Sequence, residues 1–305
     1  MATPPIQFPN DSTDELTRGP QPGHLPEDVP APAPDAGIDP DNPPWGLLEA
    51  TGLLIVSIVL MLLTYVVFII PYAVYRNVGL VGFAEFATKD PGALLVNVLS
   101  ILPAHLITLG LAWVIVTRAG KLPFLRTLGW EWRRGFTFWR SVLLAILLLL
   151  VGIGIAKVTG PADNALEQLI RSSRAASLAI AFVATLTAPL VEEIVFRGVL
   201  YSALRRLAGT AGAVACVVFI FTAIHAPQYW PSGGVIATIF ILSLSLTLIR
   251  AYTGRLLPCF IVHLVFNAIQ ATFMVLDPYL RRFSPEETAP APGLLVEFIT
   301  RLFGG

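Results

Sequence analysis

The chain has 305 residues, of which 55% are hydrophobic and only 13% are charged, and its mean hydropathy is +0.73. Soluble domains carry roughly 25% charged residues, so this composition indicates a membrane protein with the lipid bilayer as its surroundings. The formal net charge is zero and the pI is near 6.9. This balance excludes the basic surface that a nucleic-acid partner would need.

Residues 1–44 form the first predicted region. They contain twelve prolines and eight acidic residues but only one aromatic side chain. Such a segment buries too little apolar surface to offset the entropy that ordering costs. We therefore predict a disordered, Pro-rich acidic tail.

Seven apolar runs follow this tail, and each approaches the roughly 20 residues that a helix needs to cross a bilayer. The first run is too long for a signal-peptide core, so we expect it to be retained as a span. The predicted fold is an all-α polytopic transmembrane helix bundle. Its predicted spans are 47–70, 92–117, 139–157, 176–207, 211–229, 234–251 and 256–276.

Two further segments are predicted to lie at the membrane interface. Leu122 to Trp139 interleaves tryptophans with arginines, which is typical of a headgroup-level anchor. The run Gly293 to Phe303 is short and spaces Glu297 and Arg301 as an i, i+4 pair, which favours an interfacial helix over an eighth span. The predicted regions are the tail (1–44), the N-terminal spans with their interfacial linker (45–138), a second membrane domain (139–276) and a C-terminal tail with the interfacial helix (277–305).

Charged residues interrupt the fourth predicted span, in the stretch TAPLVEEIVFRGVLYSALRRL. Ionisable residues inside hydrocarbon are costly unless they are paired or hydrated, so they mark candidate functional sites. Arg197 lies one turn after Glu193 but about 140° around an α-helix from Glu192. We expect Glu193 and Arg197 to pair as supporting residues and Glu192 to carry chemistry. A purely structural ion pair is the alternative interpretation.

Two later spans add imidazoles and an amide. If the chain reverses near Gly209, Glu193 and His225 each lie sixteen residues from the turn and so reach the same depth. His263 and Asn267 share a helix face. They meet the glutamates only if the Gly209 turn projects beyond the membrane edge, and they could instead simply join neighbouring helices.

This set of side chains is typical of a hydrolase. A glutamate close to a histidine can remove a proton from water, and a second imidazole and an amide can stabilise an oxyanion. Ser202 lies nearly three turns beyond the glutamates, and Cys216 and Cys259 have no base nearby in the sequence. Direct attack by water is therefore favoured over an acyl-enzyme.

Three motifs in order resemble those of the CPBP family. They are Glu-Glu-x-x-x-Arg at Glu192, Glu193 and Arg197, Phe-x-x-x-His at Phe221 and His225, and His-x-x-x-Asn at His263 and Asn267. This family groups type II CAAX prenyl endopeptidases with bacteriocin-processing and immunity proteins. The resemblance covers roughly residues 139–276 and implies a catalytic domain with its site in a cavity of the bundle. The implied activity is intramembrane cleavage of a membrane-associated peptide or lipidated protein.

By this resemblance, Glu192 is the general base, His225 is its partner on the water, and His263 and Asn267 bind the oxyanion. The ion pair keeps its supporting role. The family is often labelled metal-dependent, and Glu192, His225 and His263 could also form a two-histidine, one-carboxylate zinc site. The chain has no His-Glu-x-x-His pair. The sequence thus favours a metal-independent glutamate mechanism and leaves zinc open as a cofactor.

Two other functional classes stay open. A non-catalytic immunity or scaffolding protein would use the polar cluster only to hold helices together. A transporter could use the carboxylates for coupling, but the sequence has no evident internal repeat. Seventeen arginines against three lysines suggest a GC-rich prokaryotic genome and a prokaryotic cell membrane. Prenylated substrates are not expected there.

Overall fold

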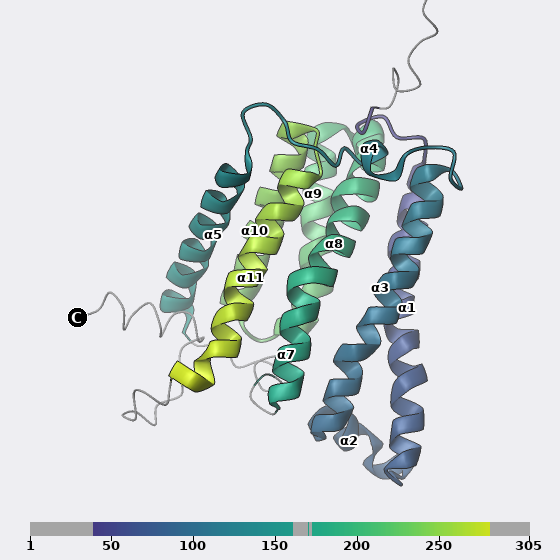
Figure 1. Cartoon of the computed structure of the whole chain (residues 1–305), viewed down its shortest axis with the longest axis vertical. Coiled ribbons are helices and arrows are strands. Elements are labelled where there is room, and N and C mark those ends of the chain that lie inside the picture. Colours follow the sequence, from purple (N-terminus) through teal and green to yellow (C-terminus); the bar gives the residue numbers. More distant parts are fainter. Residues whose placement is uncertain (1–38, 161–169, 171–172, 281–305) are drawn as a thin grey trace, which may run out of the picture. The chain divides into compact units, whose positions relative to one another are not determined.

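The computed structural model describes residues 39–160, 170 and 173–280, with side chains up to Leu276. The predicted disorder of residues 1–38 and the predicted interfacial helix at 293–303 lie outside the described residues. Within them every regular element is a helix (Figure 1). The described residues contain no strand, only an isolated bridge between Arg133 and Phe136. The predicted all-α fold is confirmed.

Six helical stretches of the described chain are long and apolar enough to cross a membrane. Five of them match single predicted spans. The remaining stretch, Arg174–Tyr229, covers both the fourth and the fifth predicted spans. The protein is therefore a multi-pass membrane protein. The six stretches are α1 (Leu47–Tyr75), α3 (Pro91–Thr117), α5 (Phe138–Thr159), the continuous stretch Arg174–Tyr229, α10 (Gly233–Thr253) and α11 (Leu257–Leu280).

The long stretch Arg174–Tyr229 turns back on itself at Gly209. Gly209 has φ 68° and ψ −179°, a left-handed backbone conformation that glycine adopts without a steric penalty. On either side of it, the rings of Phe196 and Phe221 meet edge to face with centroids 5.0 Å apart. The two halves are therefore antiparallel neighbours, as the predicted reversal near Gly209 requires, and together they account for two spans.

The first half of this hairpin departs from α-helical geometry twice. It consists of α7 (Arg174–Phe182), a π-helical turn η2 (Val183–Thr187), α8 (Ala188–Glu192) and a second π-helical segment η3 (Glu193–Leu200), and α9 (Tyr201–Tyr229) continues through the reversal. Every residue of η3 is buried. The glutamate segment is thus the centre of the bundle.

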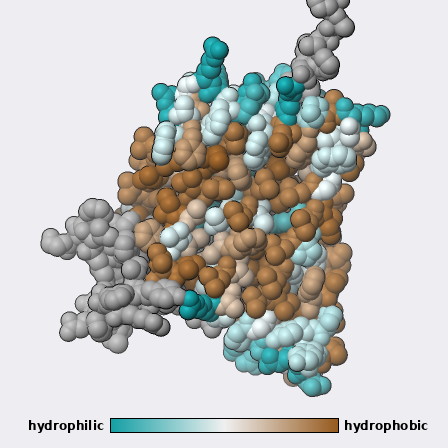
Figure 2. All heavy atoms as spheres, in the orientation of Figure 1, coloured by the Kyte–Doolittle hydropathy of each residue, from teal (hydrophilic) through white to brown (hydrophobic). Residues whose placement is uncertain are grey.

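Two groups of helices pack on either side of this segment (Figure 1). One buried cluster joins the start of α1, the end of α3 and the apolar residues of η3 and α9. A second cluster joins α5, α10 and α11. Large apolar side chains such as Leu62, Leu143 and Phe219 point outward instead and are 64%, 67% and 72% exposed. Figure 2 shows a broad hydrophobic band across this face with hydrophilic residues at both ends, and this band is the surface that a bilayer would cover.

The short elements lie between the long helices. A 3₁₀ turn η1 (Leu80–Gly82) and α2 (Phe83–Lys89) connect α1 to α3, and α4 (Phe124–Thr127) begins the linker to α5. In that linker the Trp130 ring packs on Phe260 with centroids 5.0 Å apart. The Leu256 N–H donates to the Gly129 carbonyl at 2.9 Å. The predicted interfacial linker is therefore bound to the start of α11.

Residues 39–44, the last six of the predicted tail, also contact the bundle. The Arg206 guanidinium donates to the Pro43 carbonyl at 2.9 Å, and Asp41 forms an ion pair with Arg250 at 2.7 Å. Gly129 lies close enough to Pro40 that an added Cβ would approach the proline ring to 3.1 Å. These contacts bind residues 40–43 to the hairpin, to α10 and to the linker before α5.

Candidate functional site

The site is built on the segment where α8 ends at Glu192 and η3 begins at Glu193. π-Helical turns are rare and occur frequently at functional sites, because the wider turn redirects side chains and releases backbone groups. Pro189 lies just before this point and has no N–H to continue the helical bonding. The sequence therefore favours an irregular helix at the position of the two carboxylates.

The first π-turn leaves one carbonyl without a helical partner. The Ala188 N–H donates to Val183 O, five residues back, so it does not bind Ala184 O. The next donor in a π pattern would be residue 189, which is proline. Asn267 of α11 supplies the missing bond, with its Nδ2 donating to Ala184 O at 2.8 Å. A buried carbonyl is thereby satisfied across two helices.

The predicted supporting pair meets as expected and is completely buried. Arg197 Nη1 lies 3.1 Å from Glu193 Oε1, and both side chains are 0% exposed. The arginine also donates to Ser243 Oγ at 2.9 Å and to Thr247 Oγ1 at 3.3 Å, both on α10. Its guanidinium lies 4.5 Å from the centroid of the Phe221 ring. Hydrogen bonds from three sides keep this charge tolerable away from water.

His263 reaches the same glutamate. Its Nδ1 lies 2.8 Å from Glu193 Oε1, so the Nδ1–H donates to the carboxylate and Nε2 is left to face the site. The sequence predicted that His263 would reach the glutamates only if the turn at Gly209 projects beyond the membrane edge. The structure brings the two residues together across η3 and α11.

Glu192 faces the two histidines with both oxygens. Its Oε1 lies 3.8 Å from His225 Nε2, and its Oε2 lies 3.8 Å from His263 Nε2. The Glu192 and His225 side chains are 21% and 20% exposed, whereas Glu193 is fully buried. The two adjacent carboxylates therefore differ in environment, and Glu192 is the one that a small molecule can reach.

The orientation of His225 is set by its own helix. Its Nδ1 lies 2.7 Å from Phe221 O, a carbonyl that can only accept, so the Nδ1–H donates to it and Nε2 faces Glu192. The His225 ring also stacks on the Phe221 ring with centroids 4.3 Å apart. Phe221 thus orients His225 and covers the Arg197 guanidinium. The Phe-x-x-x-His spacing places both contacts on one helix face.

The residues considered for zinc do not form a metal-binding group. Within residues 39–160, 170 and 173–280, no three His, Cys, Asp or Glu side chains are arranged to hold a metal ion. Both Nε2 atoms face Glu192, but they face it at 3.8 Å. These contacts are ion-pair distances, longer than hydrogen bonds. The arrangement suits a carboxylate and two imidazoles that share a small polar molecule.

Sequence reasoning missed two buried residues at or near the site. His105 of α3 is 4% exposed, and its Nδ1 lies 3.0 Å from Oγ1 of Thr187, which ends the first π-turn. Arg250 of α10 is 0% exposed and contacts the main chain of η3. The sequence signal was available in both cases. Each is an ionisable residue inside an apolar run, the same feature that singled out Glu192.

The predicted residues therefore fall into two groups. The side chains of Glu192, His225 and His263 converge. Glu193 supports this group, because it pairs with Arg197 and accepts a hydrogen bond from His263. Asn267 lies on the same face of α11 as His263, but one of its two amide hydrogens is already committed to Ala184 O. Its assignment to an oxyanion, like the assignment of Glu192 as a base, remains a prediction from the sequence.

Comparison with known protein families gives a match over the part of the chain that carries these residues. A family model described as Rce1-like, type II CAAX prenyl endopeptidase Rce1-like, matches residues 174–269. This range contains all three motifs, from the hairpin through Asn267. Searches of curated proteins and of solved structures gave no match. Residues 174–269 of this multi-pass membrane protein therefore resemble the Rce1-like family of type II CAAX prenyl endopeptidases.

Proposed function

We propose that this protein is an intramembrane endopeptidase that hydrolyses a peptide bond of a membrane-associated peptide or lipidated protein with water activated by Glu192. The observation that carries the proposal is the convergence of the Glu192 carboxylate on two imidazole Nε2 atoms at 3.8 Å each. A reachable carboxylate beside two imidazoles, inside an apolar bundle, is what general-base attack by water needs.

The proposed reaction begins with the water. A water bound between Glu192 and His225 donates one hydrogen to the carboxylate and the other to the His225 Nε2 lone pair. Glu192 removes its proton as the water oxygen attacks the scissile carbonyl carbon, so a C–O bond forms and the carbonyl oxygen becomes an oxyanion. Fixing the water with two acceptors aligns its lone pair for attack.

His263 is assigned to the oxyanion. Its Nδ1–H donates to the buried Glu193 carboxylate at 2.8 Å. This hydrogen bond orients the imidazole, as a carboxylate does behind a catalytic histidine. The imidazolium Nε2–H then donates to the oxyanion. Arg197 pairs directly with Glu193 at 3.1 Å.

Collapse of the intermediate completes the cycle. The C–N bond breaks, and protonated Glu192 gives its proton to the leaving amine. Glu192 is then a carboxylate again and the products are a carboxylic acid and an amine. The free amide hydrogen of Asn267 is available as a second oxyanion donor, because an Nδ2 group carries two hydrogens and Ala184 O takes one.

The test uses purified full-length protein in detergent and a fluorogenic peptide ending in a CAAX sequence, in farnesylated and unprenylated forms. Wild type should cleave at least one form, and Glu192→Gln should lose cleavage, because an amide keeps the shape but is no base. Glu85→Gln is the matched control, since Glu85 is an exposed glutamate of α2 that pairs only with Lys89 among the described residues. Equal cleavage by wild type and Glu192→Gln would refute the proposal.

A non-catalytic scaffolding or immunity protein is the second candidate. It is favoured by the number of polar contacts that join helices, such as Asn267 to Ala184 O and Arg197 to Ser243. For this candidate, Glu192→Gln should retain cellular function, because the amide preserves hydrogen bonding. Loss of both function and cleavage in that variant would exclude it.

A further inference from the structure

A second arginine, Arg250, is buried in the bundle beside the functional segment. It lies in the last turn of α10 and is 0% exposed, and none of the three motifs includes it. A buried guanidinium is costly unless a carboxylate and hydrogen-bond acceptors surround it. We therefore expect a carboxylate and several hydrogen-bond acceptors around Arg250.

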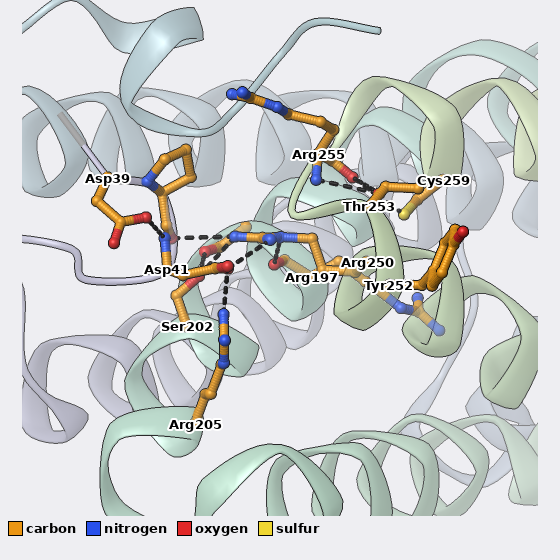
Figure 3. A network of polar contacts seen from close by, with 12 residues as sticks. Asp39, Asp41, Arg197, Ser202, Arg205, Arg250, Tyr252, Thr253, Arg255 and Cys259 are labelled. Atoms are coloured by element: carbon orange, nitrogen blue, oxygen red, sulfur yellow. Dashed lines mark hydrogen bonds and ion pairs between the residues drawn. The ribbon is translucent and has the colours of Figure 1, made fainter. Parts of the chain in front are cut away.

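The carboxylate comes from the N-terminal segment. Arg250 Nη1 lies 2.7 Å from Asp41 Oδ1, and Nη2 donates to the Pro40 carbonyl at 3.0 Å. Figure 3 shows Arg205 approaching the same carboxylate from the other side, where it forms a second ion pair. Among the described residues, Asp41 is the only carboxylate paired with Arg250. Burial alone would raise the pKa of Asp41, but the two arginines outweigh burial and hold it below its ordinary value.

The residues around Asp41 are held just as firmly. The indole Nε1 of Trp45 donates to Val199 O at 3.0 Å, and the Trp45 side chain is only 1% exposed. Arg206 donates to the carbonyls of Pro43 and Trp45. We name residues 40–45 the N-terminal strap. This strap is bound to the hairpin and to α10, although both elements lie far from it in the sequence.

Arg250 also connects the strap to the second π-helical segment. Its Nε donates to Arg197 O at 3.2 Å, and its Nη2 donates to Ser202 Oγ at 3.2 Å. In an α-helix the Tyr201 N–H would bind Arg197 O, but here it donates to Phe196 O, five residues back. Arg250 therefore satisfies a carbonyl that the π-helical geometry releases.

From that carbonyl a short chain of contacts leads to the reacting groups. The side chain of Arg197 binds Glu193 at 3.1 Å, and Glu193 accepts from His263 Nδ1 at 2.8 Å. His263 Nε2 faces Glu192 at 3.8 Å. Asp41 lies at the outer end of this chain and Glu192 at the inner end.

We propose that Asp41 is a positioning residue for the hydrolytic site, because it holds Arg250 against the Arg197 carbonyl and so fixes the π-helical segment that carries Glu193. The inference rests on the proposed function. It makes the strap part of the enzyme rather than the end of a tail. Asp41 contacts none of the three converging residues Glu192, His225 and His263, and it acts on them only through Arg250.

The experiment compares full-length variants by cleavage of the CAAX peptide and by hydrogen exchange of the backbone amides in Glu193–Leu200. Asp41→Asn keeps the shape but removes the charge that holds Arg250. Its kcat should fall by tenfold or more, because a misplacement of about 1 Å costs up to about 100-fold, while KM changes little. Exchange in Glu193–Leu200 should become faster, because the segment opens locally more often. Asp41→Glu should restore most of both values.

Two further variants separate positioning from general destabilisation. Asp39→Asn is the matched control, since Asp39 is two residues away and its carboxylate binds the Asp41 N–H rather than an arginine. It should leave kcat and exchange unchanged. Arg250→Lys keeps the charge but loses the guanidinium fork that reaches Asp41 and Arg197 O together, so it should behave like Asp41→Asn.

The outcomes distinguish this inference from the proposed function. If wild type cleaves the peptide, Glu192→Gln does not, and both Asp41→Asn and Arg250→Lys keep wild-type kcat, the positioning role is refuted and the proposed function stands. If wild type and Glu192→Gln are equally inactive or equally active, the proposed function fails and the role fails with it. Unchanged exchange in Glu193–Leu200 refutes the role whatever the activity. Loss of folded protein in Asp41→Asn leaves Arg250→Lys and Asp41→Glu to decide by the same two measurements.

Discussion

Replacing Glu193 by alanine should destabilise the folded protein strongly, because it leaves the Arg197 guanidinium buried without a carboxylate. Both side chains are fully buried. Removing one partner of a buried ion pair costs about 3–5 kcal/mol. His263 loses its acceptor in the same variant. The hydrogen bonds from Arg197 to Ser243 and Thr247 remain, so the expected loss lies near the lower end of that range.

The measurement is the free energy of unfolding in mixed detergent micelles, followed by circular dichroism as the denaturing detergent is increased. Glu85→Ala is the matched control, because the Glu85–Lys89 pair is exposed and such pairs contribute at most about 1 kcal/mol. Folded yield and cleavage should fall together in Glu193→Ala. A loss of unfolding free energy no larger than that of Glu85→Ala would refute the reasoning, since it would mean that water reaches the buried pair. Full stability without activity would instead give Glu193 a direct chemical role.

Three other predictions follow from particular contacts. The pKa of Asp41 is held below its ordinary value of 3.8, so its stabilising contribution is present above pH 3.8 and is lost as the pH falls through the folded-state pKa; unfolding midpoints measured against pH should fall more steeply in this acidic window for wild type than for Asp41→Asn. Asn267→Leu leaves Ala184 O unpaired and should cost about 1–3 kcal/mol of unfolding free energy, whereas Asn267→Gln, which keeps a donor, should cost less. Elemental analysis of active protein should find no stoichiometric metal, and chelator should leave cleavage unchanged; zinc lost together with activity would contradict the water mechanism proposed for Glu192.

The spans were predictable because a bilayer imposes a local requirement. About 20 consecutive apolar residues are needed to cross it, and backbone groups there must be satisfied within the helix. α1 and α3 follow that rule, and their bounds match the predicted spans closely. The reversal at Gly209 was also readable, since a glycine between two apolar runs and next to Arg205 and Arg206 is typical of a turn at a membrane edge.

The strap was not predictable from composition. Residues 40–45 contain three prolines and one acidic residue, which is typical of a flexible tail. What binds Asp41 is Arg250, 209 residues further along the chain. A local window contains only one half of that ion pair. The other half, Arg250, is an arginine inside a predicted span with no carboxylate nearby in the sequence. Because an unpaired charge in a membrane is costly, this arginine was a sign that a carboxylate from elsewhere in the chain would bind it.

The helical angles that separated the two glutamates assumed a regular α-helix, and the segment is π-helical from Glu193 onward. The pairing of Glu193 with Arg197 survived this error because residues four apart still lie close together in the wider turn. The hydrogen bonds that Asn267 and Arg250 make to released carbonyls could not be predicted from the spacing of residues in the sequence. Pro189 was the one local sign that the helix would be irregular here.

The two π-helical regions explain why adjacent carboxylates can have different roles. Each region releases a carbonyl, and each carbonyl is bound by a side chain from a neighbouring helix: Asn267 of α11 binds Ala184 O, and Arg250 of α10 binds Arg197 O. Glu192 lies between these two fixed points and is reached by neither side chain. A carboxylate that is held in place through its main chain, rather than through its own oxygens, keeps those oxygens available for a water molecule. Preorganisation of this kind lets a general base act without first giving up a structural bond.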